Sequence, residues 1–203
     1  MIDTWFDEDG IPHMALPRIY GLNLREYLVA HAPLAPERSR HFLSCIAETV
    51  AYAHERGVIH CDLKPENIMI PQPDPTGDVR PVIVDFGTSA LHLQSAILSE
   101  QTITAGSVRY MAPEQLLGRY STASDIYAFA IMALELVAHT RYDQLELAID
   151  EDWERNLCAQ LRDRQLGDRT IVLLVSALRW DPTQRPSRMT LWAEAFLGSL
   201  GPS

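Results

Sequence analysis

Hydrophobic periodicity divides the chain into a short extended start and a long, mostly helical remainder. Residues 1–6 and 11–16 flank the turn-forming run Asp7-Glu8-Asp9-Gly10 and predict a β-hairpin, in which Pro12 is unable to donate to the ladder. Residues 22–30 have helical spacing. An apolar stripe with a period near 3.6 then predicts a long helix that opens at Pro36, a residue suited to a first helical turn, and ends at Gly57.

Three short apolar runs follow, at residues 58–59, 68–70 and 82–84, and each predicts a short strand. A proline-rich loop, residues 71–81, separates the last two. Residues 88–112 are rich in Ser and Thr without strong periodicity, and a loop this long in a compact domain is usually functional or disordered. Further helices are predicted at 113–117, 124–138, 145–164, 169–179 and 187–200. The pattern favours a mostly α-helical fold with a few strands near residues 58–87.

Composition narrows the class of protein. With 203 residues, 47% of them hydrophobic, the chain is long enough for one globular domain without a disulfide or metal staple. A net charge of −10 disfavours nucleic acid and anionic membranes as partners. The acidic start has no secretory pattern, and three scattered cysteines indicate free thiols, so we expect a cytoplasmic protein.

One polar segment, His60-Cys61-Asp62-Leu63-Lys64-Pro65-Glu66-Asn67, lies between two predicted strands and carries an unusual set of groups. Asn67, together with Asp85 further on, offers the hard oxygen donors that Mg²⁺ shares with phosphates. Asp62 is able to orient and deprotonate a hydroxyl, and Lys64 to neutralise charge on a moving phosphoryl group. Phosphoryl transfer requires mainly positioning and electrostatic stabilisation, and this set indicates that chemistry.

This segment, read as His-x-Asp-x-Lys-x-x-Asn and followed by Asp85-Phe86-Gly87, resembles the catalytic loop and metal-binding motif of protein kinases. Further kinase-like motifs follow in the order typical of the family: residues 106–110, Met111-Ala112-Pro113-Glu114, residues 124–129 and residues 179–186. The resemblance implies an α+β, protein kinase-like fold: a mostly α-helical large (C-terminal) lobe with short strands and a residual N-terminal β-hairpin.

The resemblance also implies roles for individual residues. Asp62 matches the base that accepts the substrate hydroxyl proton, and Lys64 the lysine that contacts the γ-phosphate. Asn67 and Asp85 match the metal ligands. The resemblance implies three further arrangements: Phe86 near His60, Ser107 bridging Asp62 and Lys64, and a buried ion pair between Glu114 and Arg185.

The same comparison places three residues around the adenine of ATP. Met69 matches the floor of the adenine pocket, Leu16 the gatekeeper, and the backbone of Ile19 the hinge, although Met69 and Leu16 fit a purely structural role equally well. The expected cofactors are therefore ATP and Mg²⁺, and the expected substrate is a Ser or Thr hydroxyl of a protein. Cys61 stands where many kinases carry Arg, which implies that phosphorylation of the loop does not switch this protein through that arginine.

The resemblance begins at the fourth strand of the kinase small lobe, without the Gly-rich loop, the strand lysine or the helix glutamate. We therefore expect residues 1–20 to form a residual small-lobe hairpin and hinge, and residues 21–203 the kinase C-lobe. Because an isolated hairpin is marginally stable, we also expect a homo-oligomer or a partner chain that completes the small lobe. The chain is then a fragment of a longer kinase, a natural minimal kinase, or a protein without catalytic activity.

Three functions fit these features. The first is Ser/Thr protein kinase activity with Mg-ATP. The second is a pseudokinase-type regulatory or scaffold module that uses the helices of residues 124–200 as an interaction surface. The third is a small-molecule kinase of similar fold, which the Ala-Pro-Glu segment disfavours because that segment suits peptide docking.

Overall fold

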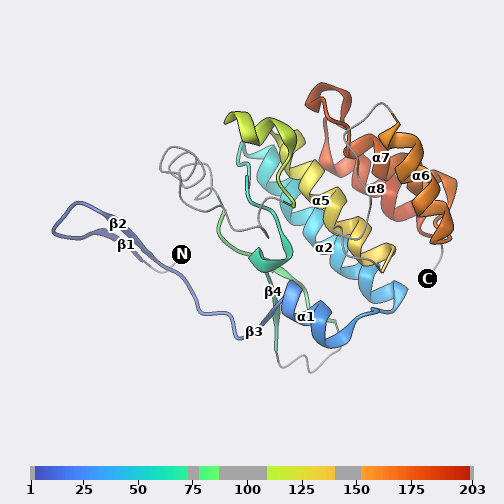
Figure 1. Cartoon of the computed structure of the whole chain (residues 1–203). Helices are drawn as coiled ribbons and strands as arrows, with labels where there is room; N and C mark the ends of the chain where they lie inside the picture. The colour runs from blue at the N-terminus through green and yellow to red at the C-terminus, as the bar shows by residue number, and fades with distance from the viewer. Residues whose placement is uncertain (1–2, 73–77, 87–108, 140–151, 202–203) are drawn as a thin grey trace.

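The chain forms a helical body with one hairpin that projects from it (Figure 1). The computed structural model describes residues 3–72, 78–86, 109–139 and 152–201. Within these ranges the elements are, in chain order, β1 (Asp3–Phe6), β2 (Pro12–Ala15), β3 (Gly21–Asn23), α1 (Leu24–His31), α2 (Pro36–Glu55), the 3₁₀ turn η1 (Pro65–Asn67), β4 (Ile68–Pro71), β5 (Val82–Ile83), η2 (Pro113–Leu117), α5 (Thr122–Val137), α6 (Trp153–Asp163), α7 (Asp168–Ala177), η4 (Pro182–Gln184) and α8 (Met189–Ser199).

Helix α5 is the centre of the body. Twelve of its sixteen residues are buried, which is the pattern of a helix surrounded by other elements rather than of one lying on a surface. It packs against α2 on one side and α7 on the other. Helix α2 turns the predicted stripe inward, with Phe42, Ile46 and Val50 fully buried, and it runs beside α5 in the helical body (Figure 1).

Aromatic contacts join the last helices to this centre. Trp192 of α8 stacks on Phe196 with ring centroids 5.3 Å apart and meets the edge of Phe129 of α5 at 5.7 Å. The indole nitrogen of Trp192 donates to the carbonyl oxygen of Leu173 in α7 at 3.0 Å. Three helices are therefore fixed to one another around a single side chain.

A three-stranded antiparallel sheet, ordered β3-β4-β5, carries the segment with the polar motif. Gly21 pairs with Pro71, Asn23 with Met69, and Ile68 with Ile83. The motif ends in η1, which leads directly into β4. The sheet therefore fixes one end of the motif, while the end of α2 precedes the other.

The structure corrects two local predictions. The helix predicted at residues 22–30 begins only at Leu24, because Leu22 belongs to β3 and Asn23 caps the helix: its side chain accepts from the Glu26 amide, and the Glu26 carboxylate accepts from the Asn23 amide. Residues 58–59 form no strand. The Val58 amide instead donates to the carbonyl oxygen of Ala53 and closes the end of α2.

The other predicted elements are present with small shifts of their ends, including the hairpin and the helices at 124–138, 169–179 and 187–200. The predicted helix at 145–164 is seen from Trp153 onward, and residues 145–151 lie outside the described part. The same applies to residues 88–108 of the predicted loop. In the described ranges, no helix is both long and apolar enough to cross a membrane.

Candidate active site

A buried carboxylate of α5, that of Asp125, holds the backbone of the polar segment. Asp125 accepts the backbone amide hydrogens of His60 and Cys61 at 2.8 and 2.9 Å, one on each carboxylate oxygen. The ring of His54 in α2 reaches the same carboxylate at 2.8 Å. Cys61 has a positive φ of 69°, which is unusual for a residue with a side chain, and the two amide contacts hold the backbone in that turn.

A second side chain, that of Gln115, also holds this segment. Gln115 in η2 donates its amide to the carbonyl oxygen of Cys61 at 2.7 Å and accepts from the Ala112 amide at 2.8 Å. Its side chain is buried. Gln115 is not among the residues predicted from the sequence, and its local signal is its place two residues after Pro113, where its side chain caps the 3₁₀ turn.

The side chains of Lys64 and Asn67 both contact Oδ2 of the Asp62 carboxylate. Lys64 Nζ lies 2.6 Å from Asp62 Oδ2, and Asn67 Nδ2 donates to the same oxygen at 3.1 Å and to the Asp62 carbonyl oxygen at 2.8 Å. The two charged side chains remain partly open to solvent, with 15% and 24% of the Lys64 and Asp62 side chains exposed. Because Oδ2 carries both contacts, Oδ1 is the oxygen of Asp62 on which the described residues place no hydrogen bond.

Asp85 lies two residues after β5, the strand that pairs with β4 at the end of this loop. The Val84 amide donates to the Asn67 carbonyl oxygen at 2.9 Å, and the His60 ring contacts the Val84 carbonyl oxygen at 3.0 Å. Asp85 is exposed and has a φ of 62°. The Phe86 ring lies against His60 with centroids 4.7 Å apart, which is the contact the sequence predicted. Asp85 therefore directly follows Val84, whose backbone is hydrogen-bonded to the first and the last residue of the polar segment.

The donor chemistry of Asn67 and Asp85 fits a magnesium ion. Both contacts made by the Asn67 side-chain nitrogen go to Asp62, which leaves the amide oxygen as the atom able to meet a cation. Carboxylate and amide oxygens are hard donors, and magnesium in phosphoryl-transfer sites takes few protein ligands because phosphate and water supply the others. Among the described residues, no group of three or more His, Cys, Asp or Glu forms a metal cluster of its own.

Of the three residues predicted to contact adenine, Met69 lies in the three-stranded sheet, and Leu16 and Ile19 lie in the segment between β2 and β3. Met69 is half-buried in β4, opposite Asn23 and Val82. Leu16, directly after β2, is half exposed, and Ile19 is partly buried. The Gln72 amide donates to the Tyr20 carbonyl oxygen at 2.9 Å, so the segment with Leu16 and Ile19 runs to the end of the strand that bears Met69.

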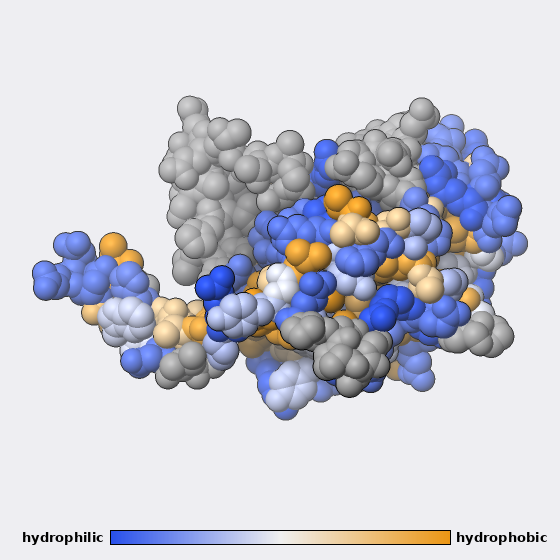
Figure 2. Space-filling view, turned by 90° about the horizontal axis from the view of Figure 1, so that it is seen from below, coloured by the Kyte–Doolittle hydropathy of each residue, from blue (hydrophilic) through white to orange (hydrophobic). Residues whose placement is uncertain are grey.

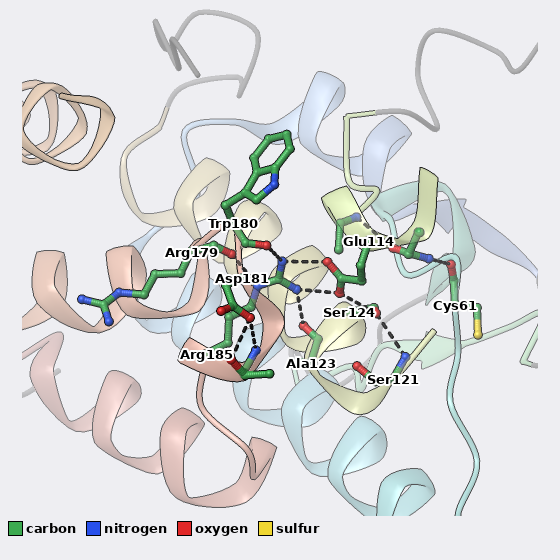
Figure 3. A network of polar contacts seen from close by, with 12 residues as sticks. Cys61, Glu114, Ser121, Ala123, Ser124, Arg179, Trp180, Asp181 and Arg185 are labelled. Atoms are coloured by element: carbon green, nitrogen blue, oxygen red, sulfur yellow. Dashed lines mark hydrogen bonds and ion pairs between the residues drawn. The ribbon is translucent and has the colours of Figure 1, made fainter. Parts of the chain in front are cut away.

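A buried ion pair between Glu114 and Arg185 joins η2 to the segment just before α8 (Figure 3). Arg185 donates from its two terminal nitrogens to the two carboxylate oxygens of Glu114 at 2.7 and 2.8 Å. It also donates to three backbone carbonyl oxygens, those of Ala123, Arg179 and Trp180. Ser124 donates to Glu114 at 2.8 Å. This pair, predicted from the sequence, holds η2 and therefore Gln115 against α5.

A second polar cluster next to the loop was not predicted. Arg25 of α1 contacts Glu66 of the loop at 3.2 Å, Glu135 of α5 at 3.1 Å, and the hydroxyl of Tyr110. Tyr110 donates to Glu135 at 2.7 Å. Burial, and then the neighbouring Glu135 carboxylate, raise the pKa of Tyr110 and keep it neutral. These residues are distant in sequence, and no local pattern links them.

Some predicted residues lie outside the described part of the chain. They include Gly87 of the Asp-Phe-Gly motif, Ser107, and the run 106–108. Their predicted roles stay predictions.

Comparison with known proteins identifies the class to which this fold and loop belong. A solved kinase domain, a double mutant of PknI from Mycobacterium tuberculosis, superposes with a TM-score of 0.63 at 22% identity, over 91% of this chain and 64% of that one. The protein kinase domain family model matches residues 1–197. The chain therefore belongs to the protein kinase family.

Curated relatives make the class more specific. Serine/threonine-protein kinase PrkC of Bacillus subtilis is 36% identical over 132 residues, which is 64% of this chain and 19% of that protein. Serine/threonine-protein kinase D of Synechocystis sp. is 28% identical over 206 residues, which is 97% of this chain and 37% of that protein. The chain is a Ser/Thr protein kinase family member that spans between about a fifth and two fifths of the length of these relatives.

Proposed function

We propose that this chain transfers the γ-phosphoryl group of ATP to a Ser or Thr hydroxyl of a protein, with magnesium as the cofactor. The observation that carries the proposal is the convergence of Lys64 and Asn67 on Oδ2 of Asp62, which fixes the carboxylate and leaves Oδ1 to accept a proton. Membership of the Ser/Thr protein kinase family supports the same reaction.

In the proposed reaction, Asp62 accepts the hydroxyl proton while the hydroxyl oxygen forms a bond to the γ-phosphorus. The bond from that phosphorus to the bridging oxygen breaks, and ADP leaves with the electron pair. Lys64 balances the negative charge on the transferred group. Magnesium, held by Asn67 and Asp85, would screen the phosphate charges. Met69, Leu16 and the backbone of Ile19 would contact the adenine.

We further propose that residues 1–20 act as a residual small-lobe hairpin and hinge, and residues 21–203 as the kinase C-lobe. The projection of the hairpin from the body and the start of the three-stranded sheet at Gly21 support this division. A second polypeptide, either another copy or a different chain, would complete the small lobe. The three free cysteines support a reducing location, and we propose the cytoplasm.

The test measures Mg-ATP binding by calorimetry and phosphate transfer to a mixture of Ser- and Thr-containing peptides. We expect Asp62→Asn to lower transfer about a hundredfold or more while Mg-ATP binding persists, because the substitution removes the base but keeps the size of the side chain. Asp163→Asn, an exposed carboxylate in α6, is the matched control and should change neither quantity.

Three results would contradict the proposal. Equal transfer by the unchanged chain and by Asp62→Asn would show that the transfer comes from a contaminant. A failure to bind Mg-ATP at millimolar concentration would remove the nucleotide site. Binding of Mg-ATP with no transfer to any peptide would support the pseudokinase-type module instead.

A further inference from the structure

The hairpin of β1 and β2 exposes both of its faces. In the described part of the chain, β1 pairs with β2 alone, and all four residues of β1 are exposed. Figure 1 shows the hairpin extending away from the helical body, and Figure 2 shows it as a separate arm from a second direction. A two-stranded hairpin without a packing partner is marginally stable in water, so contacts within it must hold its shape.

Those contacts are present and are concentrated at the turn. Asp7 accepts the amide hydrogens of Asp9 and Ile11 at 3.0 and 2.8 Å, and its second carboxylate oxygen contacts the His13 ring at 2.8 Å. The His13 ring stacks on Trp5 of the opposite strand, with centroids 5.3 Å apart and planes 9° apart. The hairpin is therefore an ordered surface before any partner arrives, which lowers the entropic cost of binding.

This ordered surface is rich in exposed apolar side chains. Of the fifteen large hydrophobic residues that are exposed in the described ranges, six lie within the first twenty residues. Phe6 is 73% exposed and Met14 51%. The pairing of Thr4 with Met14 and of Phe6 with Pro12 places Phe6 and Met14 on the same face, as diagonal neighbours. Apolar groups gathered in this way indicate a contact surface rather than random exposure.

The two edges of the hairpin are not equivalent. Pro12 has no backbone N–H, so β2 lacks one of the donors that an added strand needs. The run Asp3–Phe6 contains no proline, so every residue of β1 has a backbone N–H; that of Thr4 donates to the neighbouring Asp3 carboxylate at 2.8 Å, an exposed contact that an added strand would replace. A further strand is expected to pair with β1.

The negative charge of the hairpin disfavours a second copy of this chain as its binding partner and favours a different polypeptide. Residues 1–17 contain four carboxylates, those of Asp3, Asp7, Glu8 and Asp9, and no Lys or Arg. The hydrogen bond from His13, with those from the turn amides, lowers the pKa of Asp7 and keeps it ionised. Two copies joined at the hairpin would bring these carboxylates together, in chains that each carry a net charge of −10.

We propose that the hairpin binds an extended, positively charged segment of another polypeptide, which pairs with β1 and covers Phe6 and Met14. Backbone pairing supplies affinity, the apolar pair supplies burial, and the carboxylates select basic side chains on the added strand. This inference rests on the proposed role of residues 1–20 and specifies the chemistry of the partner, but it does not depend on phosphoryl transfer.

The experiment uses a fluorescently labelled, end-capped decapeptide of alternating Lys and Val, and measures its binding by anisotropy. Two control peptides separate the contributions: one with Glu in place of Lys, and one of the basic sequence with alternate backbone nitrogens methylated, which prevents strand pairing along one edge. We expect binding of the basic peptide to be at least tenfold tighter than that of either control. Binding should weaken as salt is raised, because part of the affinity comes from exposed charges.

Variants of the chain locate the binding site. Phe6→Thr with Met14→Thr keeps strand-forming residues on the hairpin and should weaken binding of the basic peptide at least tenfold. Val172→Thr, an equally exposed apolar position in α7, is the matched control and should leave it unchanged. Calorimetry with Mg-ATP on the same double variant should give the affinity of the unchanged chain.

Four outcomes would overturn the proposal. They are no binding of the basic peptide at millimolar concentration, equal binding of the acidic or methylated peptide, unchanged binding by the Phe6/Met14 double variant, and a dimer in sedimentation that the double variant abolishes. The last would make a second copy the occupant. Peptide binding by a chain that fails to bind Mg-ATP would contradict the proposed catalytic function and leave this inference standing.

Discussion

Arg185 and Glu114, 71 positions apart in sequence, form a two-fold hydrogen-bonded ion pair in the interior of the protein (Figure 3). None of the Arg185 side chain and 7% of the Glu114 side chain are exposed. Removing the cation alone would leave a buried carboxylate for which Ser124 is the one remaining side-chain donor among the described residues.

We therefore expect Arg185→Met to lower the free energy of unfolding by about 3–5 kcal/mol, measured by urea denaturation. Adding Glu114→Leu should restore part of that loss, because no unpaired charge remains, although three backbone carbonyl oxygens still lose their donor. Arg188→Met, at an exposed position, should change the free energy by less than about 0.5 kcal/mol. A loss below about 1 kcal/mol for Arg185→Met would contradict the stabilising role of the pair.

Asp125 controls the backbone of the candidate active site through its two carboxylate oxygens. In Asp125→Asn, one acceptor becomes an NH₂ group that faces an amide donor, either that of His60 or that of Cys61. We expect a loss of about 1–3 kcal/mol in the free energy of unfolding and faster hydrogen exchange at these two amides.

The exchange measurement distinguishes this role from general stabilisation. Amides in the middle of α8, far from the substitution, should keep their protection relative to the lowered global stability, while those of His60 and Cys61 lose more. Unchanged protection at both amides would show that Asp125 does not hold the loop. The exposed carboxylate variant Asp163→Asn should have no effect at either place.

Local patterns in the sequence were sufficient for most of the fold. The period of the apolar stripe from Pro36 onward predicted α2, and the proline at its first turn predicted its start. Strand β3 was missed because it has only three residues and pairs with residues 69–71, far along the chain. The cap formed by Asn23 and Glu26 was readable in the sequence and marks where the helix begins. The strand predicted at residues 58–59 was wrong, because a run of two apolar residues is too short to show a periodicity.

In the candidate site, too, residues that are close in sequence were predicted, and contacts between distant segments were not. Asp62, Lys64 and Asn67 are near neighbours in sequence, and the kinase-like motif that contains them singled them out as one set. The residues that hold them in place are 54 to 65 positions away, as Gln115 is from Cys61 and Asp125 from His60. Only the arrangement of α5 and η2 against the loop brings these groups together, so a single sequence gave no signal for the contacts of Gln115.

Gly21 is the position at which the sheet tolerates no side chain. Its φ is 151°, and a Cβ placed there would lie 2.1 Å from the carbonyl oxygen of Ile70 on the paired strand. Gly21→Ala must therefore push β3 away from β4, and we expect a loss of about 1–3 kcal/mol in the free energy of unfolding by urea denaturation. Gly198→Ala, with open space in α8, should instead leave stability unchanged or raise it by up to about 1 kcal/mol. Equal effects of the two variants would contradict this account.

Cys61 lies beside the proposed catalytic Asp62, and its thiol is held in the neutral form. Burial, and then the carboxylates of Asp125 and Asp62, raise the pKa of Cys61 from 9.0 to about 11. The thiolate, not the thiol, reacts with iodoacetamide. In the folded chain at pH 8.5, we expect Cys61 to react about a hundredfold more slowly than in the chain unfolded by urea, with peptide mapping by mass spectrometry as the measurement.

The pH dependence separates this electrostatic effect from simple shielding of the sulfur. Because the folded pKa is raised, the contribution of the protonated thiol to stability is fully present below pH 9 and decreases as the pH rises toward 11. The alkylation rate of the folded chain should therefore keep rising through pH 10, where that of the unfolded chain has levelled off. A plateau near pH 9 in the folded chain would mean that Cys61 has an ordinary thiol and that the carboxylates around it do not act on it.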